Sequence, residues 1–282
     1  MDVHNTVTGF HEACRRAAKP LGLVPTMGSI HDGHRALLQR ARSENETVAA
    51  TIFVNPTQFT QSGDYEAYPR SLDADLEVFR REGVDIAFTP EVGEIYPEGF
   101  DTRVDVGRIA KRLEGAHRPG HFEGVATVVS KLLSIARPDR AYFGEKDAQQ
   151  CLVIRRLNAD LDLSAEIVVI PTVREPDGLA LSSRNVHLGP EERNAATVLY
   201  RAICNAERVW ENGESDAETI RAGMLSLLAD EPMASVDYVS VADARTLDEL
   251  DTVDRPALVT LAVSIGSVRL IDATNLKGDR TT

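Results

Sequence analysis

The fold of this chain is decided by the stretch Val24-Pro25-Thr26-Met27-Gly28-Ser29-Ile30-His31-Asp32-Gly33-His34. An apolar run at residues 21–24 leads into it, and residues 35–42 follow it without a helix breaker. The stretch therefore predicts a buried strand, a tight turn and the start of a helix. In α/β proteins such a turn binds phosphate, because free backbone N–H groups and the positive end of the helix point at the ligand.

Two glycines and two histidines give this turn its chemical character. Gly28 and Gly33 carry no Cβ atom, so the backbone can come close to a ligand at both positions. His31 and His34 are three residues apart, which places both rings on the same side of a helix start. Such imidazoles can stabilise the charge on an α-phosphoryl group, although a histidine pair in a glycine-containing turn can also be incidental.

The composition is that of an ordinary globular protein. The chain has 282 residues, 43% of them hydrophobic and 27% charged, which suits one large or two modest domains. The formal net charge of −13 argues against a general nucleic-acid binder, because such proteins carry a basic surface. A phosphate ligand must then be held by a local cluster of basic groups and N–H donors.

The spacing of the cysteines and the lack of long apolar runs favour a cytoplasmic protein. Cys14, Cys151 and Cys204 are widely spaced, so we expect neither a disulfide framework nor a structural zinc site, and we expect a cytoplasmic protein. Residues 1–4 show neither a basic segment nor the start of a long apolar run, so we expect no signal peptide. We also expect no contact with a membrane, because no apolar run approaches the ~20 residues that span a bilayer.

Apolar strands alternate with helices through the first part of the chain. After the first strand, further strands are predicted at residues 48–54, 85–88, 140–143 and 166–170. Helices are predicted at residues 8–18, 35–42, 71–81, 122–136 and 147–158, with Ser71 as an N-cap. This alternation predicts an α/β fold with a doubly wound parallel sheet, in which ligands bind at the carboxyl ends of the strands. Residues 89–121, rich in Pro and Gly, predict a long excursion over that site.

The pattern changes near Pro171. The later elements are predicted helices at residues 191–210 and 217–228 and predicted strands at residues 236–241, 257–263 and 268–271. Short connections between these strands favour an antiparallel sheet. We therefore predict two domains, residues 1–172 with the parallel sheet and residues 173–282 as a smaller α+β domain.

Polar residues collect where the parallel strands are predicted to end. The second strand is followed by Asn55 and Gln58, the fourth by residues 144–150, and the fifth by residues 174–185, while the first strand is followed by Met27, Gly28, His31 and His34. A right-handed fold brings these segments to one edge of the sheet. There Lys146 offers a point charge to a phosphate, and Ser182-Ser183-Arg184 offers hydroxyls, N–H groups and a guanidinium.

Each of these residues also has a plain structural interpretation. Asp147 can bind a ribose hydroxyl or Mg²⁺, or it can cap a helix. Gln58 and Gln150 can hydrogen-bond a small molecule that carries hydroxyls and amides, or they can face solvent. Arg118 and His121 can meet a carboxylate or phosphate, or they can decorate the start of a helix. The convergence on one sheet edge favours the functional interpretation.

Several blocks of the sequence together resemble the pantothenate synthetase family. They are residues 25–34, 53–59, 68–70, 118–125, 143–147 and 177–185, and they occur in the order of the family. Ser29-Ile30 stands where the family has Ala-Leu, which is a conservative change. Residues 60–64 differ from the usual loop, a difference that can alter loop mobility but removes no assigned role.

The resemblance implies the ATP-dependent joining of pantoate to β-alanine through a pantoyl adenylate, with release of pyrophosphate and then AMP. It also implies a Rossmann-like N-terminal domain that binds ATP and pantoate, a smaller C-terminal lid, a homodimer, and Mg²⁺ on the ATP phosphates. The residues it implies for ATP binding are Met27, Gly28, Ser29, Ile30, His31, Asp32, Gly33, His34, Gly144, Glu145, Lys146, Asp147, Val173, Leu181, Ser182, Ser183 and Arg184.

Catalytic and substrate-binding roles also follow from the resemblance. His34 is implied as the proton donor, with electrostatic support from His31, and Lys146 is implied to act on the phosphates. The residues implied for substrate binding are Gln58 for pantoate and β-alanine, Gln150 for pantoate, and Asn55, Arg118 and His121 as further candidates. Asp147 is the candidate for a metal contact.

Two other interpretations compete with a ligase. A nucleotidyltransferase, as in cytidylyl transfer, would keep the nucleotide in its product, whereas a ligase releases free AMP and requires an amine. A nucleotide-sensing protein on an inactive enzyme fold would bind ATP without turnover when pantoate and β-alanine are both supplied. Every motif keeps its reactive groups here, which favours the ligase.

Overall fold

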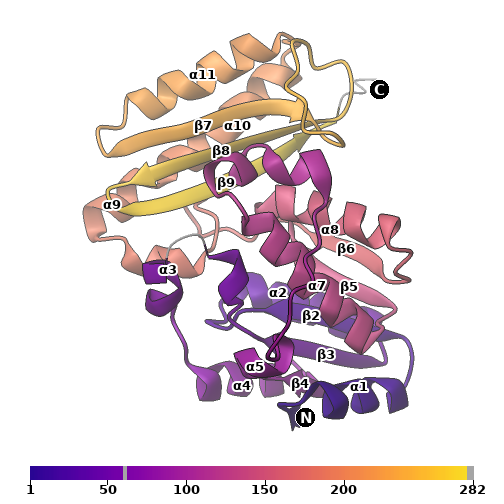
Figure 1. The fold of residues 1–282 in the computed structure, drawn as a ribbon. Coiled ribbons are helices and arrows are strands. Elements are labelled where there is room, and N and C mark those ends of the chain that lie inside the picture. Colours follow the sequence, from indigo (N-terminus) through magenta and orange to yellow (C-terminus); the bar gives the residue numbers. More distant parts are fainter. Residues whose placement is uncertain (60–61, 278–282) are drawn as a thin grey trace. The chain divides into compact units, whose positions relative to one another are not determined.

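The structure is a computed structural model that describes residues 1–59 and 62–277 (Figure 1). The chain divides into two compact units, unit 1 with Met1–Glu145 and Gln149–Pro171, and unit 2 with Lys146–Ala148 and Thr172–Thr282. The segment Lys146–Ala148 thus belongs to unit 2, although the predicted division placed it in the first domain. The expected effect of the loop at residues 60–64 lies outside the described residues, since residues 60–61 and the side chains of 62–64 are not described.

Within the described residues, unit 1 is built on a six-stranded parallel sheet with the order β1-β4-β3-β2-β5-β6. Its strands are β1 (Asp2–His4), β2 (Leu21–Thr26), β3 (Thr47–Ile52), β4 (Ile86–Phe88), β5 (Arg140–Gly144) and β6 (Glu166–Ile170). All the pairs are parallel, so the carboxyl ends lie at one edge, and the strand order reverses between β2 and β5. The predicted doubly wound sheet is confirmed.

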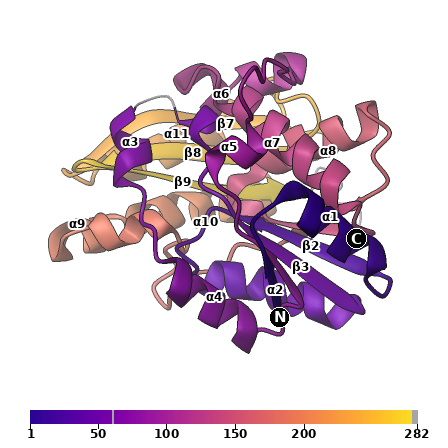
Figure 2. The same cartoon turned by 60° about the horizontal axis from the view of Figure 1, so that its bottom comes forward.

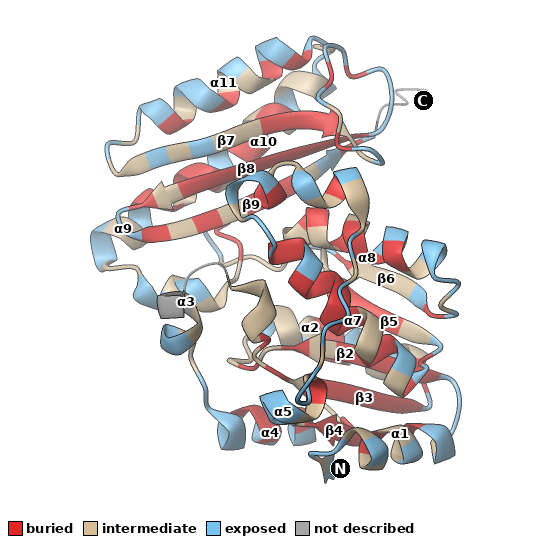
Figure 3. Ribbon diagram, viewed as in Figure 1, coloured by how far each residue is buried: buried red, intermediate tan, exposed pale blue. Residues whose placement is uncertain are grey.

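Helices cover both faces of this sheet. One face carries α2 (Asp32–Glu44) and α4 (Leu72–Arg81), and the other carries α1 (Val7–Arg16), α7 (His121–Ala136) and α8 (Ala148–Asp160) (Figure 2). Leu38 of α2 and Phe79 of α4 pack on Val24 and Val48 of the sheet. Because β2 and β3 are covered on both faces, they are buried along nearly their whole length (Figure 3), which explains why their sequences are continuous apolar runs.

The excursion predicted at residues 89–121 contains short helices that the sequence pattern did not indicate. They are α5 (Val92–Ile95), the 3₁₀ segment η2 (Gly107–Lys111) and α6 (Glu114–His117). Each spans about one turn, which is too short to show a helical period. The buried amide of Gln149 ties this region to α8: its Oε1 accepts from the Glu114 N–H (3.0 Å), and its Nε2 donates to the carbonyls of Ile109 (2.9 Å) and Arg112 (2.7 Å).

Ser71 occupies the N-cap position of α4, as predicted, but within the described residues its side chain makes no capping hydrogen bond. Its ψ of 64° departs from the extended backbone of most N-caps. The predicted capping role of Ser71 is therefore wrong. The first turn of α4 carries instead the acidic residues Asp73 and Asp75.

Unit 2, as far as it is described, holds a three-stranded antiparallel sheet with the order β7-β8-β9. Its elements are the strands β7 (Ala234–Asp243), β8 (Ala257–Ile265) and β9 (Val268–Leu276) and the helices α9 (Pro190–Ala195), α10 (Thr197–Glu211) and α11 (Ala217–Ala229). Leu199 of α10 and Met224 of α11 pack with Val259 of β8 in one core. The antiparallel sheet was predicted, whereas the predicted single helix at 191–210 is interrupted at Ala196, where no Pro or Gly signals a break.

Among the residues that the structure describes, none of the helices combines the length and the apolarity that crossing a bilayer requires.

Candidate active site

Residues 27–31 form the turn between β2 and α2 in unit 1. Gly28 has φ = +83° and Ser29 has φ = +53°, so both lie in the left-handed region. A Cβ atom at Gly28 would lie 2.8 Å from Oδ2 of Asp75. Backbone conformation and space therefore both require glycine at position 28.

The backbone N–H groups of this turn bind within the protein. Ser29 donates to Oδ2 of Asp75 (2.9 Å), Ile30 donates to Oδ1 of the same carboxylate (2.8 Å), and Gly28 donates to Oγ1 of Thr26 (3.2 Å). The prediction that the N–H groups of the turn stay free for phosphate is therefore wrong for these three residues. The assignment of Gly28, Ser29 and Ile30 to ATP binding stays a prediction.

His31 and His34 cap the start of α2 reciprocally. The Nδ1 atom of His31 accepts from the Gly33 N–H (3.1 Å), and Nδ1 of His34 accepts from the His31 N–H (3.4 Å). The ring centroids are 4.1 Å apart, which confirms that both rings lie on one side of the helix start. Because each Nδ1 accepts, each neutral ring carries its hydrogen on Nε2. Each ring of the pair thus carries one Nε2–H donor.

A hydrogen-bond network joins the ends of β2 and β3. Asn55 is 1% exposed; its Oδ1 accepts from the hydroxyls of Thr57 (2.8 Å) and Tyr96 (2.8 Å). Burial raises the pKa of the Tyr96 hydroxyl, which keeps it a donor. The Nδ2 of Asn55 donates to Oε1 of Gln58 (3.0 Å) and to the Gly124 carbonyl (3.1 Å). This arrangement suits Asn55 to orienting Gln58.

Gln58 is held on both sides. Its Nε2 donates to Sδ of Met27 (3.0 Å), while its backbone carbonyl accepts from Nδ1 of His121 (2.8 Å) and from Nη2 of Arg118 (3.4 Å). The Nε2 of His121 lies 3.3 Å from Nη1 of Arg118, so Arg118 donates and His121 carries its hydrogen on Nδ1. Unit 1 therefore brings together five predicted residues: Met27, Asn55, Gln58, Arg118 and His121.

Gly124 allows α7 to approach the 3₁₀ segment η1 (Pro56–Gln58), and its replacement by alanine should be costly. A Cβ atom there would lie 2.3 Å from the Thr57 carbonyl oxygen and 2.7 Å from the Gln58 nitrogen. Because both are backbone atoms, η1 must move, and we expect Gly124→Ala to lower the free energy of unfolding by about 3 kcal/mol. Urea denaturation measures this loss.

Gly93 supplies the matched control for that substitution. It lies in α5, and a Cβ atom there would meet nothing within 4 Å. Gly93→Ala should therefore leave the free energy of unfolding within about 1 kcal/mol of the parent value. Equal stability of the Gly124→Ala and Gly93→Ala proteins would contradict the close approach of α7 to η1.

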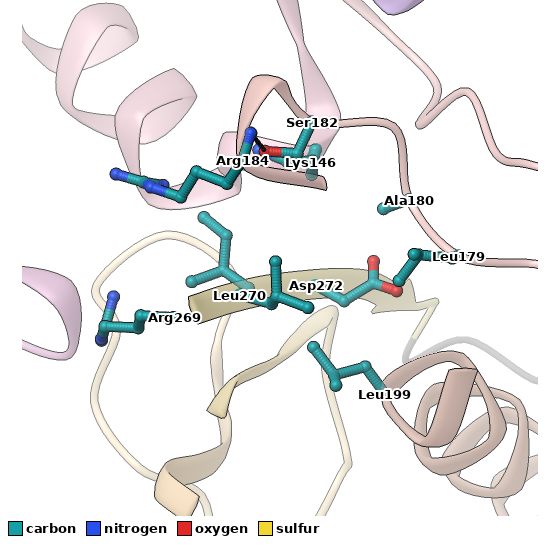
Figure 4. Close-up of a pocket in the computed structure, with 10 residues that line it drawn as sticks. Lys146, Leu179, Ala180, Ser182, Arg184, Leu199, Arg269, Leu270 and Asp272 are labelled. Carbon is teal, nitrogen blue, oxygen red and sulfur yellow. Dashed lines mark hydrogen bonds between the residues drawn. The ribbon is translucent and has the colours of Figure 1, made fainter. Parts of the chain in front are cut away.

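Basic residues of unit 2 gather around one small pocket (Figure 4). Lys146, Ser182 and Arg184, all predicted site residues, line it together with Leu179, Ala180, Leu199, Arg269, Leu270, Ile271 and Asp272. The Lys146 side chain is 16% exposed, and its Nζ lies 3.2 Å from Oδ2 of Asp147. In a chain of net charge −13, this is a local cluster of basic groups of the kind that can bind a phosphate.

The segment that carries Ser182 and Arg184 follows a hairpin that hydrogen bonds hold in place. Residues 173–181 form a hairpin in which the Leu181 N–H donates to the Val173 carbonyl (3.0 Å). Arg174 binds Asp272 of β9 through two hydrogen bonds of 2.7 and 3.0 Å, and the Asp272 side chain is 2% exposed. The Oγ of Ser182 then accepts from the Arg184 N–H (3.3 Å) at the start of η4 (Ser183–His187).

The comparison with known proteins identifies the family. A family model described as Pantoate-beta-alanine ligase matches residues 2–275. The chain belongs to this family. Among pantoate–β-alanine ligases, the pantothenate synthetase of Roseiflexus sp. (strain RS-1) is 56% identical over 272 residues, which cover 96% of this chain and 98% of the relative.

Solved structures of the ligase family match over nearly the whole chain. The pantothenate synthetase from Thermus thermophilus aligns with a TM-score of 0.93 at 47% identity, and 99% of each chain is covered. A pantoate–β-alanine ligase from Francisella tularensis, complexed with beta-gamma ATP and β-alanine, aligns with a TM-score of 0.80 at 36% identity over 97% of each chain.

The remaining predicted residues of this ligase family member lie at the ends of strands and helices. Gly144 ends β5, Glu145 and Asp147 lie in the 3₁₀ segment η3 (Glu145–Asp147), and Gln150 is half-buried in the first turn of α8. The Asp32 carboxylate is bound by Nη1 of Arg35 (2.9 Å) on the surface of α2.

Sequence reasoning missed residues that support the site. Asp75 resembles any acidic residue in a first helical turn, and Tyr96 and Gly124 act through contacts distant in sequence. Arg269 comes from β9 and lines the pocket with Lys146, far from any quoted motif. No local sequence signal distinguishes these residues from ordinary surface or core positions.

Proposed function

We propose that this chain catalyses the ATP-dependent condensation of pantoate with β-alanine. The pantoate carboxylate attacks the α-phosphorus of ATP and displaces pyrophosphate, which gives pantoyl adenylate. The β-alanine amine then attacks the acyl carbon, loses a proton and displaces AMP, which gives pantothenate. The observation that carries this proposal is the family match over residues 2–275, and the Francisella tularensis relative complexed with beta-gamma ATP and β-alanine supports it.

The imidazole pair suits the first half-reaction. Adenylation brings two anions together, so catalysis must position them and stabilise the charge that develops on the α-phosphoryl group. The Nε2–H groups of His31 and His34 are the hydrogen-bond donors that we assign to this charge. His34, which the resemblance implies as the proton donor, is assigned the main hydrogen bond to an α-phosphoryl oxygen. Lys146, Ser182, Ser183 and Arg184 are assigned to the β- and γ-phosphates.

The amide network suits the recognition of the small substrates. Gln58, held between Asn55 and Met27, is assigned to pantoate and β-alanine, and Gln150 to pantoate. Asn55, Arg118 and His121 contribute by fixing Gln58 and its backbone. The further residues assigned to ATP are Met27, Gly28, Ser29, Ile30, Asp32, Gly33, Gly144, Glu145, Asp147, Val173 and Leu181. This proposal assigns residues 1–172 to ATP and pantoate binding and residues 173–282 to a lid.

Mg²⁺ fits this site as a companion of the ATP phosphates. Within the described part of the chain, no group of three or more His, Cys, Asp or Glu side chains could hold a metal ion. Mg²⁺ commonly uses one or two carboxylates together with substrate phosphates, and Asp147, whose carboxylate binds Lys146, can supply one. Bound there, the ion would neutralise charge on the phosphates.

An isotope-exchange assay tests the proposal. With ATP, Mg²⁺ and pantoate but no β-alanine, the protein should exchange labelled pyrophosphate into ATP, because adenylation is reversible and needs no amine. Omission of pantoate is the control and should abolish exchange. Absence of pantoate-dependent exchange would refute the adenylate mechanism.

Product analysis separates the two competing functions. A ligase releases free AMP and consumes β-alanine, whereas a nucleotidyltransferase retains the nucleotide in its product. A nucleotide sensor would bind ATP without forming any product. We further propose a homodimer, which the family resemblance implies, and a cytoplasmic location, which the wide spacing of Cys14, Cys151 and Cys204 along the sequence favours.

A further inference from the structure

The carboxylate of Asp75 fills an anion-binding position in the turn before the histidines. Asp75 lies in the first turn of α4 and is 4% exposed. Its two oxygens accept the consecutive N–H groups of Ser29 (2.9 Å) and Ile30 (2.8 Å). Successive backbone N–H groups of this kind form a nest that binds anions. Here the anion belongs to the protein itself, so these two donors are already used.

The turn that Asp75 holds is conformationally strained. Ser29 has φ = +53°, and a residue other than glycine in this region costs on the order of 1 kcal/mol. Ile30 is followed directly by His31, the N-cap of α2. A turn released from Asp75 can relax, and the cap that fixes both rings then shifts with it.

The position of Asp75 is itself fixed by the core. Its neighbour Leu76 and Phe79, one turn on, pack in the same cluster as Leu37 and Leu38 of α2. The space around the carboxylate is tight, because a Cβ atom at Gly28 would lie 2.8 Å from Oδ2. Because the core fixes the position of α4, the Asp75 carboxylate holds the turn at a fixed distance from α4.

We propose that Asp75 is a positioning residue for adenylation, and the proposal rests on the function proposed above. Asp75 holds the turn so that the rings of His31 and His34 face the α-phosphoryl group. It also occupies the N–H groups of Ser29 and Ile30. The charge on the α-phosphoryl group is therefore stabilised by side-chain donors and not by these two backbone groups. Asp75 acts through the histidines and does not touch the substrate.

The two half-reactions provide the test. In Asp75→Asn the amide offers one oxygen and one NH₂ group to two N–H donors, so one contact becomes repulsive. We expect pantoate-dependent pyrophosphate exchange to fall about 10–100-fold, since small misplacements of catalytic groups have effects of this size. The conversion of supplied pantoyl adenylate and β-alanine to pantothenate should be retained, because no bond forms at phosphorus in that step.

Two further variants sharpen the test. Asp75→Glu keeps the charge and both acceptors but is longer, so it should fold and still lose exchange if position matters. Asp139→Asn is the matched control, because the Asp139 carboxylate accepts the Leu21 N–H (2.6 Å) at the opposite end of β2. That control should leave the ratio of the two half-reaction rates unchanged.

The outcomes separate this proposal from the proposed function. Failure of the parent protein to exchange pyrophosphate would refute the function. An active parent together with normal exchange in Asp75→Asn and Asp75→Glu would overturn the role of Asp75. An equal loss of both half-reactions in these variants would also overturn it, since that result describes a merely structural residue.

Discussion

Replacement of His34 by alanine should reduce pantoate-dependent pyrophosphate exchange by about 10²–10⁴-fold, the range seen when a general acid or a transition-state donor is lost. The variant lacks the Nε2–H donor that we assign to the α-phosphoryl group. It also loses one capping contact, between its Nδ1 and the His31 N–H, which is long at 3.4 Å. Loss of a cap costs about 1 kcal/mol, so the protein should stay folded.

His34→Asn separates the two roles of this imidazole. The Oδ1 atom of asparagine can take the place of Nδ1 and accept the His31 N–H, but nothing replaces Nε2–H. This variant should match the parent in thermal stability and still lose exchange. Exchange at the parent rate in His34→Asn would show that the ring acts only as a cap, and the catalytic assignment would fail.

The parallel sheet could be predicted because its strands carry their own signal. Strands β2 and β3 are buried on both faces, which forces a continuous apolar run that no surface segment needs. Strand β1, at the edge of the sheet, was not predicted, because its three residues are too few to show an alternating or continuous apolar pattern. The interruption between α9 and α10 was missed because Ala196 is itself a good helix former.

The histidine pair could be predicted for a different reason, since its spacing alone places both rings on one side of α2. The state of the turn could not be predicted. Whether Ser29 and Ile30 keep free N–H groups depends on Asp75, which lies 46 and 45 residues away. Sequence periodicity describes which face of an element is buried, but it cannot show which buried carboxylate meets which N–H group.

The amide network illustrates the same limit. The residues after β2 and β3 were predicted to meet at one edge of the sheet, and there Met27 and Gln58 are joined by a hydrogen bond of 3.0 Å. The contacts that hold Gln58 come from Tyr96, from the start of α7 and from the absence of a side chain at Gly124. A glycine within a helix reads in sequence only as a weak position, and its packing role appears once α7 meets η1.

Replacement of Lys146 by alanine should lower the rate of pantothenate formation by about 10²–10³-fold, because one preorganised charge that stabilises the departing pyrophosphate contributes a factor of this size. The Lys146 side chain lines the pocket together with Ser182 and Arg184 and is 16% exposed. Solvent therefore screens its charge only weakly, and a water molecule that enters the variant does not supply a cation. Loss of Lys146 also leaves Asp147 without this cation, which adds repulsion toward a phosphate. Steady-state kinetics with ATP as the varied substrate measures the effect.

Lys111→Ala is the control that isolates the position of the charge. Lys111 also pairs with an aspartate, Asp105 at 2.8 Å, but both side chains are more than half exposed, at 67% and 51%. An exposed pair contributes about 0–1 kcal/mol to stability, so this variant should fold and turn over like the parent. If Lys146→Ala and Lys111→Ala retained equal activity, the pocket of unit 2 could not be the phosphate site. Removal of its mostly buried cation would then have no larger effect than removal of a mostly exposed one.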